Sequence, residues 1–179
     1  YIANATGCSS IWANSSPSTP YTTNKQGHGP AWSNSLFEDA AEFGYGMLLA
    51  QRAIRDRLKD ELDGIAANTD KEDIKAAIKE WNDTFASGIE NGPATEKLVA
   101  ALESCGCDAS KAVLKEKDYL AKKSQWIFGG DGWAYDIGFG GVDHVLASGK
   151  DINIMVFDTE VYSNTGGQSS KSTPTGAIA

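Results

Sequence analysis

The pattern of apolar and polar positions divides the chain into two kinds of segment. Short apolar runs at residues 2–5, 125–128 and 152–157 are typical of buried strands, and the last is apolar enough for a strand covered on both faces. Between residues 64 and 123, apolar residues instead recur at helical spacing, with Lys and Glu on the other faces. The pattern predicts a sheet interrupted by a helical insertion that is solvated on its outside.

Two further helices are predicted beside the expected strands. One should begin near Asn34 or Ser35 and run to about Leu62, and the other should span residues 136–148. The second lies between two expected strands, and the order strand, helix, strand implies a right-handed parallel crossover. The sequence therefore predicts an α/β fold, with a parallel sheet flanked by helices.

Composition and charge narrow the possible functions. The net charge of −8 and the lack of a basic stripe argue against a nucleic acid as a partner. No apolar run reaches the ~18 residues needed to span a membrane. Three cysteines in 179 residues favour a reducing, cytoplasmic compartment over a disulfide framework. Since the chain does not begin with Met, we expect residues 1–179 to be one domain of a larger polypeptide.

A glycine-rich stretch, GGDGWAYDIGFGG at residues 129–141, directly follows one of the expected strands. It places Asp131 just past the end of that strand, while Asp158 and Thr159 lie just past the end of the next strand. The carboxyl ends of parallel neighbours meet at one edge of a sheet, where ligands of open α/β sheets bind. We therefore expect these polar side chains to lie close together.

The same edge suits an anion and a hard cation. The predicted helix near Asp136 points its N-terminus there, and Gly130 and Gly132 let the backbone pass close to an anion without a Cβ in the way. Mg²⁺ prefers about six oxygen ligands and seldom takes all of them from protein. The Asp131 carboxylate, a hydroxyl or amide oxygen, a carbonyl, phosphate oxygens and water would complete its shell. The sequence thus predicts a diphosphate held on an acidic domain through Mg²⁺.

The spacing between these motifs narrows the ligand further. A GDG turn on its own is common, but here 25 residues separate Gly132 from the polar pair Asp158-Thr159, which ends another strand. This arrangement resembles the thiamine diphosphate fingerprint, in which GDG is followed by two Asn-like residues. Many proteins with that fingerprint have Asn-Asn or Asp-Asn at the pair. Thr159 is a departure, and its hydroxyl still offers Mg²⁺ a neutral oxygen.

Three longer stretches carry a resemblance to one family. They are ATGCSS (5–10), GPAWSNSLFEDAAEFGYGM (29–47) and DTEVYSNTGGQSSKSTPTGA (158–177). Together they resemble the thiamine-diphosphate-binding domain of the pyruvate:ferredoxin (flavodoxin) oxidoreductases in their long single-chain form. The resemblance covers most of the chain outside the helical insertion. His28 is a departure, because many members have Arg at its position.

The resemblance implies an activity, cofactors and partners. In that family, pyruvate and coenzyme A give acetyl-CoA and CO₂, and electrons leave through [4Fe–4S] clusters to ferredoxin or flavodoxin. Thiamine diphosphate, Mg²⁺ and these clusters are the implied cofactors, in a cytoplasmic homodimer. Other domains of the same chain would supply the glutamate that activates thiamine diphosphate, because no catalytic residue is identified in this segment. A segment with only the diphosphate half of the site is expected to be inactive on its own.

The resemblance also implies roles for particular residues. Asp131, Thr159 and the Val161 carbonyl would hold Mg²⁺. Residues of three loops would bind the cofactor: Thr6, Gly7, Cys8, Gly130, Asp131, Gly132, Ser163 and Asn164. Cys8 matches the family cysteine that helps to ligate the cluster nearest the cofactor. The remaining thiolates of that cluster would come from parts of the protein outside this chain.

Two other functions stay open. In a non-redox thiamine diphosphate enzyme, such as a decarboxylase or synthase, Cys8 would be incidental. A module that binds a nucleotide without catalysis is disfavoured by the spacing from Asp131 to Thr159 and by the lack of a P-loop lysine. The simplest interpretation of Cys105 and Cys107 is a pair of free thiols at a helix end.

Overall fold

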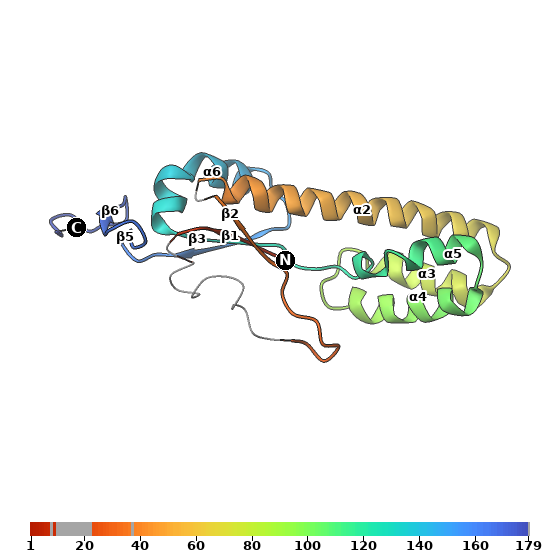
Figure 1. Ribbon diagram of the computed structural model, residues 1–179. Coiled ribbons are helices and arrows are strands. Elements are labelled where there is room, and N and C mark those ends of the chain that lie inside the picture. Colours follow the sequence, from red (N-terminus) through yellow and green to blue (C-terminus); the bar gives the residue numbers. More distant parts are fainter. Residues whose placement is uncertain (8, 10–22, 37, 179) are drawn as a thin grey trace. The chain divides into compact units, whose positions relative to one another are not determined.

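The computed structural model contains two compact units (Figure 1). The sheet unit comprises residues 1–48 and 124–179, and the helical unit comprises residues 49–123. Each unit has a buried core of its own. The residues whose structure is described are 1–7, 9, 23–36 and 38–178.

The sheet unit is built on four parallel strands in the order β2-β1-β3-β4. Their bounds are Ile2–Ala5 for β1, Trp32–Ser35 for β2, Trp126–Gly130 for β3 and Asn153–Phe157 for β4. β3 and β4 are neighbours, in a register that pairs Gly130 with Phe157. The predicted α/β fold with a parallel sheet is confirmed, and the carboxyl ends of β3 and β4 share one edge.

Strand β2 corrects the prediction of a helix that begins near Asn34 or Ser35. These residues pair with β1, and helix α2 begins at Ala40. Asn34 Oδ1 accepts hydrogen bonds from Asn4 Nδ2 at 2.9 Å and from Trp32 Nε1 at 3.1 Å. Ser and Asn are weak helix formers, and pairing with a strand 30 positions earlier decides the conformation.

Two helices cover one face of this sheet: α6 (Phe139–Ala147) and the first turns of α2 (Ala40–Asn68) (Figure 1). Helix α2 approaches β3 so closely that a Cβ on Gly44 would lie 2.5 Å from Ile127 Cγ1. Most core residues here are small, which permits this close approach: Ala5, Ala40, Ala41, Ile127, Trp133, Ala134, Val142 and Val145.

Strand β4 differs from the prediction of a strand covered on both faces. It lies at one edge of the described sheet, and Met155 at its centre is 42% exposed. Ile154 and Val156 pack against the core beneath the helices, whereas Met155 lies on the other face because side chains alternate along a strand. A continuous apolar run therefore predicted the strand correctly but not the covering of both its faces.

The backbone turns helical as soon as β3 ends, which corrects the predicted helix start near Asp136. Residues Gly132–Ile137 form a π-helical turn, and Gly138 N–H donates to Trp133 O at 2.7 Å. Trp133 is fully buried, and Cβ atoms on Gly129 and Gly138 would lie 2.2 Å and 2.4 Å from its ring. These two glycines make room for the indole, which fixes the turn directly after Asp131.

The helical unit packs the later turns of α2 with three shorter helices, α3 (Glu72–Asp83), α4 (Asn91–Cys105) and α5 (Asp108–Leu114), followed by a 3₁₀ turn at Lys117–Tyr119. Its core consists of large apolar side chains: Leu58, Leu62, Ile74, Ile78, Trp81, Leu98, Leu102, Val113 and Leu120. The unit begins at Leu49, within α2, whereas the insertion predicted from sequence was residues 64–123.

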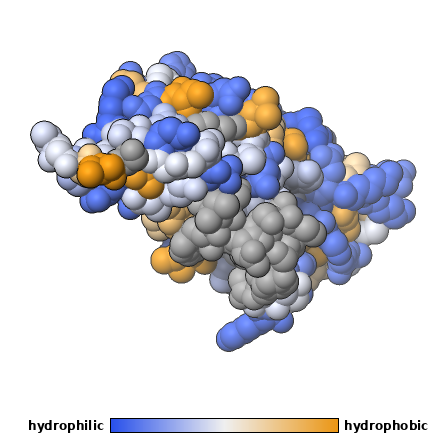
Figure 2. Space-filling view, turned by 60° about the vertical axis from the view of Figure 1, so that its left-hand side comes forward, coloured by the Kyte–Doolittle hydropathy of each residue, from blue (hydrophilic) through white to orange (hydrophobic). Residues whose placement is uncertain are grey.

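The face of the molecule shown in Figure 2 is mainly hydrophilic, and its apolar residues form scattered patches. Large exposed apolar side chains occur in both units, among them Ile89 and Leu146. No described helix is both long enough and apolar enough to cross a membrane.

Candidate functional site

Asp131 is the centre of a polar cluster at the carboxyl edge of the sheet. It follows β3 directly and its side chain is fully buried. Its Oδ1 accepts hydrogen bonds from the backbone N–H and the hydroxyl of Thr159, both at 3.2 Å. Its Oδ2 accepts hydrogen bonds from Ser170 Oγ and, at 3.0 Å, from Ser172 Oγ. Both carboxylate oxygens are therefore satisfied by neutral donors, which a buried carboxylate requires.

These donors decide the charge of Asp131. Burial alone raises the pKa of this carboxyl, because it disfavours the ionised form. Hydrogen bonds from the Ser170 hydroxyl, the Thr159 N–H and the Ser172 hydroxyl oppose burial, and together they hold the pKa below its ordinary value. Asp131 is therefore an ionised carboxylate at neutral pH, and its negative charge can attract a cation.

The Thr159 hydroxyl lies among three other oxygens. It is 3.2 Å from Asp131 Oδ1, 3.0 Å from the Val161 carbonyl oxygen and 2.6 Å from Ser163 Oγ. Mg²⁺ with bonds of 2.0–2.1 Å requires neighbouring ligand oxygens about 2.9 Å apart, the edge of an octahedron. The structure thus brings together the three residues predicted to hold Mg²⁺, and the separations of the Thr159 hydroxyl from the other two oxygens are close to this edge length.

A strained turn shapes the loop between β4 and β5 (Val161–Tyr162). Glu160 has a φ of +62°, a left-handed conformation that is uncommon outside glycine. Asp158 Oδ1 accepts a hydrogen bond from Glu160 N–H at 3.0 Å, and Thr173 Oγ donates to the Glu160 carbonyl. The turn directs the Val161 carbonyl back toward Thr159 and is held in that shape from both sides.

Ser170 and Ser172 were not identified from the sequence. They reach Asp131 because β5 and β6 (Gln168–Ser169) form an antiparallel hairpin, closed by Gly167 N–H, which donates to Tyr162 O at 3.0 Å. Gly167 has a φ of +80°, which favours glycine. The pair Gly166-Gly167 lies in the loop between β5 and β6, and a short glycine-containing loop of this kind is a hairpin signal that could have predicted this reversal of the chain.

Gly132 lies against an aromatic residue of the hairpin. A Cβ at this position would lie 2.6 Å from the Tyr162 ring, and Tyr162 OH donates to the Gly132 carbonyl at 3.2 Å. The missing side chain therefore makes room for Tyr162, which ties the hairpin to the start of the π-helical turn. Gly130 is buried and paired with Phe157, so it extends the sheet up to Asp131.

The remaining predicted site residues lie at the same edge or outside the described residues. Thr6 and Gly7 follow β1, the other neighbour of β3, and the Thr6 hydroxyl donates to Ser35 O at 2.6 Å. Asn164 is exposed in the turn after β5. Cys8, the predicted cluster ligand, lies outside the described residues. Binding of thiamine diphosphate and Mg²⁺ by this set stays a prediction.

The donor set suits Mg²⁺ better than a transition metal. Among the residues that the structure describes, no group of three or more His, Cys, Asp or Glu could hold a metal ion. The Asp131 cluster offers one carboxylate, hydroxyls and a carbonyl, all of them hard oxygen ligands. Such a partial set is typical of Mg²⁺ sites in which substrate or cofactor phosphates and water complete the shell.

Comparisons with known proteins show similarity to much longer polypeptides. Pyruvate-flavodoxin oxidoreductase of Klebsiella pneumoniae is 56% identical over 180 residues, which cover 99% of this chain and 15% of that protein. Pyruvate:ferredoxin oxidoreductase of Moorella thermoacetica is 54% identical over 185 residues, covering 99% of this chain and 16% of that protein. Mitochondrial pyruvate dehydrogenase (NADP⁺) of Euglena gracilis is 48% identical over 184 residues, which cover 99% of this chain and 10% of that protein.

A scan against profiles of known protein families finds no match. The chain spans 15% of the length of its Klebsiella relative and 16% of its Moorella relative, so the similarity concerns one part of each. Identity of this level along nearly the whole chain nevertheless establishes common descent. The chain is therefore homologous to one segment of the pyruvate-flavodoxin and pyruvate:ferredoxin oxidoreductase family.

Proposed function

We propose that this chain is the part of a pyruvate oxidoreductase that holds Mg²⁺ and the diphosphate of thiamine diphosphate. The Asp131 cluster carries the proposal. An ionised carboxylate, the Thr159 hydroxyl and the Val161 carbonyl lie together at the edge of a parallel sheet. The names of the relatives support pyruvate as the substrate of the complete enzyme.

Each residue of the cluster has a separate task in this proposal. Asp131, Thr159 and Val161 bind the cation, which compensates the charge of a diphosphate on a chain whose own net charge is −8. Ser170 and Ser172 fix the orientation of Asp131 through its Oδ2. The diphosphate would be contacted by the loops of Thr6-Gly7 and Ser163-Asn164. When bound, thiamine diphosphate would stabilise the negative charge that loss of CO₂ leaves on a 2-oxoacid.

The rest of the reaction belongs to other parts of the enzyme. We propose a cytoplasmic, homodimeric enzyme that forms acetyl-CoA and CO₂ from pyruvate and coenzyme A, with Cys8 among the ligands of a [4Fe–4S] cluster. The three relatives described above, at 48–56% identity, are named for flavodoxin, ferredoxin or NADP⁺. Since this segment is similar in all of them, the choice of electron acceptor is made elsewhere in the polypeptide.

The test measures how cofactor binding depends on Mg²⁺. The full-length enzyme that contains this segment is freed of divalent ions and cofactor, then titrated with thiamine diphosphate in a calorimeter, with and without Mg²⁺. Binding should require Mg²⁺, and Asp131→Asn should weaken it roughly 100-fold, because an anionic ligand is lost. Pyruvate-dependent acceptor reduction should fall in parallel.

Asp158→Asn is the matched control, because Asp158 lies at the same edge but bonds only to Glu160 N–H among the interactions seen. Asparagine keeps that acceptor, so cofactor affinity should stay within about 2-fold of wild type. Equal affinity with and without Mg²⁺ in the wild type, or unchanged affinity in Asp131→Asn, would overturn the proposal. Iron analysis of the same protein separates an oxidoreductase from a non-redox enzyme that uses the same cofactor.

A further inference from the structure

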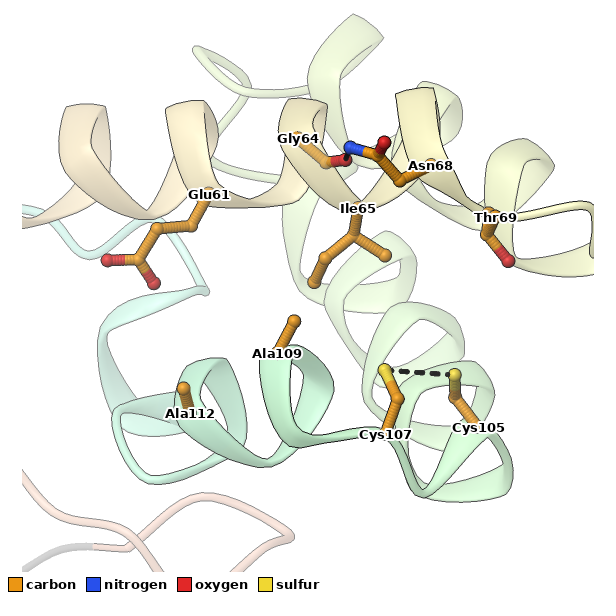
Figure 3. A pocket seen from close by; sticks show the side chains of 9 residues that line it. All are labelled: Glu61, Gly64, Ile65, Asn68, Thr69, Cys105, Cys107, Ala109 and Ala112. Carbon is orange, nitrogen blue, oxygen red and sulfur yellow. Dashed lines mark hydrogen bonds between the residues drawn. The ribbon is translucent and has the colours of Figure 1, made fainter.

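Two cysteines of the helical unit lie in contact at the corner between α4 and α5. Cys105 is the last residue of α4 and Cys107 immediately precedes α5, and their Sγ atoms are 3.3 Å apart (Figure 3). Gly106 between them has a φ of +64°, a left-handed conformation that lets the chain turn so sharply. Both cysteines are free. The fold therefore presents the two sulfurs as a pair.

The surroundings of the pair make the two thiols unequal. Cys107 is exposed and Cys105 is half-buried against the helical core. Cys107 Sγ lies 3.1 Å from Ser110 Oγ and accepts a hydrogen bond from Ser110 N–H at 3.4 Å. Hydrogen bonds from the Ser110 hydroxyl, the Ser110 N–H and the Cys105 thiol lower the pKa of Cys107 from 9.0 to about 7. Cys107 is thus the accessible thiol, about half of it ionised near pH 7, with Cys105 behind it.

A pocket of about 580 Å³ opens beside the two sulfurs, between α2 and α5 (Figure 3). Its walls include the apolar side chains of Ile65, Ala109 and Ala112. Glu61 also lines it, and its carboxylate is paired with Arg57 at 2.7 Å, which limits repulsion of a thiolate or an anionic reagent. The pocket gives a small organic molecule a path to the exposed sulfur.

We propose that Cys105-Gly106-Cys107 is a redox-active dithiol site that exchanges with low-molecular-weight disulfides. The Cys107 thiolate attacks one sulfur of an external disulfide R–S–S–R, forms a mixed disulfide with it and releases RS⁻. The Cys105 thiol then gives its proton to the solvent, and its sulfur attacks the Cys107 sulfur and releases the second RS⁻. The two cysteines lose two electrons and two protons, and the external disulfide becomes two thiols.

The geometry favours a disulfide between Cys105 and Cys107 over separate reactions of the two thiols. The Sγ atoms must approach by about 1.3 Å to reach the disulfide bond length of ~2.0 Å, a movement that the exposed Gly106 turn can absorb. A structural metal site fits less well, because two sulfurs supply only half of a tetrahedral set. No cluster of three or more metal-binding side chains accompanies them within the described part of the chain.

Oxidation also has a structural consequence at α5. The Cys107 sulfur accepts the N–H of Ser110 and so satisfies one of the free amides at the start of the helix. A disulfide sulfur carries no negative charge and is a weaker acceptor. Closing the ring should therefore loosen the first turn of α5 without affecting the core formed by Leu62 and Leu102.

The test follows the two cysteines in the full-length enzyme. The protein is reduced, equilibrated without oxygen in glutathione buffers of increasing oxidised fraction, alkylated with iodoacetamide and digested with trypsin. Cleavage after Lys97 and Lys111 gives a peptide, residues 98–111, that carries these two cysteines and no other. This peptide should change from doubly alkylated to unalkylated with the loss of two hydrogen atoms. A peptide that stays doubly alkylated across the series would overturn the proposal.

Two single variants test the order of attack. In Cys105→Ser, glutathione should remain attached to Cys107, because no second sulfur displaces it. In Cys107→Ser, Cys105 should react several-fold more slowly at pH 7 than Cys107 does in Cys105→Ser, because Cys107 is exposed and its lowered pKa increases its thiolate fraction. Equal rates in the two variants would overturn the assignment of Cys107 as the nucleophile. Ser110→Ala keeps both sulfurs and should slow the reaction of Cys107 but not that of Cys105.

Discussion

The two units of the chain use their interiors for different purposes. In the helical unit, large side chains such as Trp81 and Leu98 fill the core, and the buried polar residue Asn91 accepts from Arg55 and from Lys122 N–H. In the sheet unit the core residues are mostly small, and a carboxylate, Asp131, is buried at its edge, where its hydrogen-bond donors among the described residues are neutral. The first interior supports packing, whereas the second supports a charged group.

This difference indicates where each unit gains and loses stability. Burial of large apolar side chains stabilises a fold by about 1.5–3 kcal/mol each. At Asp131, hydrogen bonds from the Ser170 hydroxyl, the Thr159 N–H and the Ser172 hydroxyl outweigh the cost of burying the charge, because they hold its pKa below the ordinary value. Substitutions in the helical unit should therefore reduce stability without changing cofactor binding, whereas substitutions around Asp131 should weaken cofactor binding as well as the stability of their own region.

The largest effect on stability should come from Trp81→Ala in the helical unit. The indole is fully buried, donates from Nε1 to Leu120 O at 3.2 Å and packs edge-on against Phe85 at 5.1 Å. Its removal leaves a cavity and should cost about 3–5 kcal/mol of local stability. Hydrogen exchange of peptides from residues 49–123 in the intact enzyme measures this loss. Affinity of the folded enzyme for thiamine diphosphate should not change, and a parallel loss of affinity would contradict the separation of roles.

The carboxylate of Asp131 should contribute about 2 kcal/mol to the stability of its own region, a range typical of hydrogen bonds to a charged group. Because its folded pKa is lowered, this contribution is complete above the unfolded value of ~3.9 and is lost as the pH falls through the folded pKa. Between about pH 5 and pH 8, the difference in hydrogen exchange between wild type and Asp131→Asn over residues 157–173 should therefore be constant. A difference that disappears on going from pH 8 to pH 5 would mean that burial outweighs the hydrogen bonds.

A smaller effect on binding is expected for Ser170→Ala. The hydroxyl donates to Asp131 Oδ2, and its loss should let the carboxylate rotate and weaken Mg²⁺-dependent cofactor binding about 10-fold. The neighbouring Ser169 is exposed, so Ser169→Ala is a matched control that should bind normally. Ser170→Thr keeps a hydroxyl and should restore part of the affinity. Equal affinity in the two alanine variants would show that Ser170 does not position Asp131.

Much of the fold followed from the sequence because its signals are local. Apolar runs identified β1, β3 and β4, and the order strand, helix, strand identified the parallel pairing of β3 with β4. Strand β2 was missed because the sequence Trp-Ser-Asn-Ser has neither an apolar run nor alternation strong enough to show a strand. These residues form a strand because they pair with β1, which is distant in the sequence.

The residues of the candidate site also divide into those that local signals predicted and those that were missed. Asp131 and Thr159 were identified because each follows a strand at one sheet edge, and the structure brings them into contact. Ser170 and Ser172 were missed because their contact with Asp131 spans about 40 positions and depends on the reversal at Gly166-Gly167. Spacing along the chain shows which strands are parallel neighbours, but it does not show which loop folds back over their ends.

The smallest effect on stability should come from removing the ion pair between Lys97 on α4 and Glu80 on α3. Their charged atoms are 2.6 Å apart, yet the two side chains are 63% and 43% exposed. Water screens such a pair, and ordering two long side chains costs entropy, so Lys97→Met should change local stability by less than ~0.5 kcal/mol. The methionine keeps the apolar stem, which isolates the charge.

A double-mutant cycle with Glu80→Gln, followed by hydrogen exchange of residues 72–105, gives the coupling free energy of this pair. That coupling should shrink further at about 1 M salt, where the screening length is only ~3 Å. A coupling above about 1 kcal/mol that is insensitive to salt would mean that surface charge, and not only the apolar core around Trp81, holds α3 against α4. The helical unit would then resemble the sheet unit in depending on charged groups for its stability.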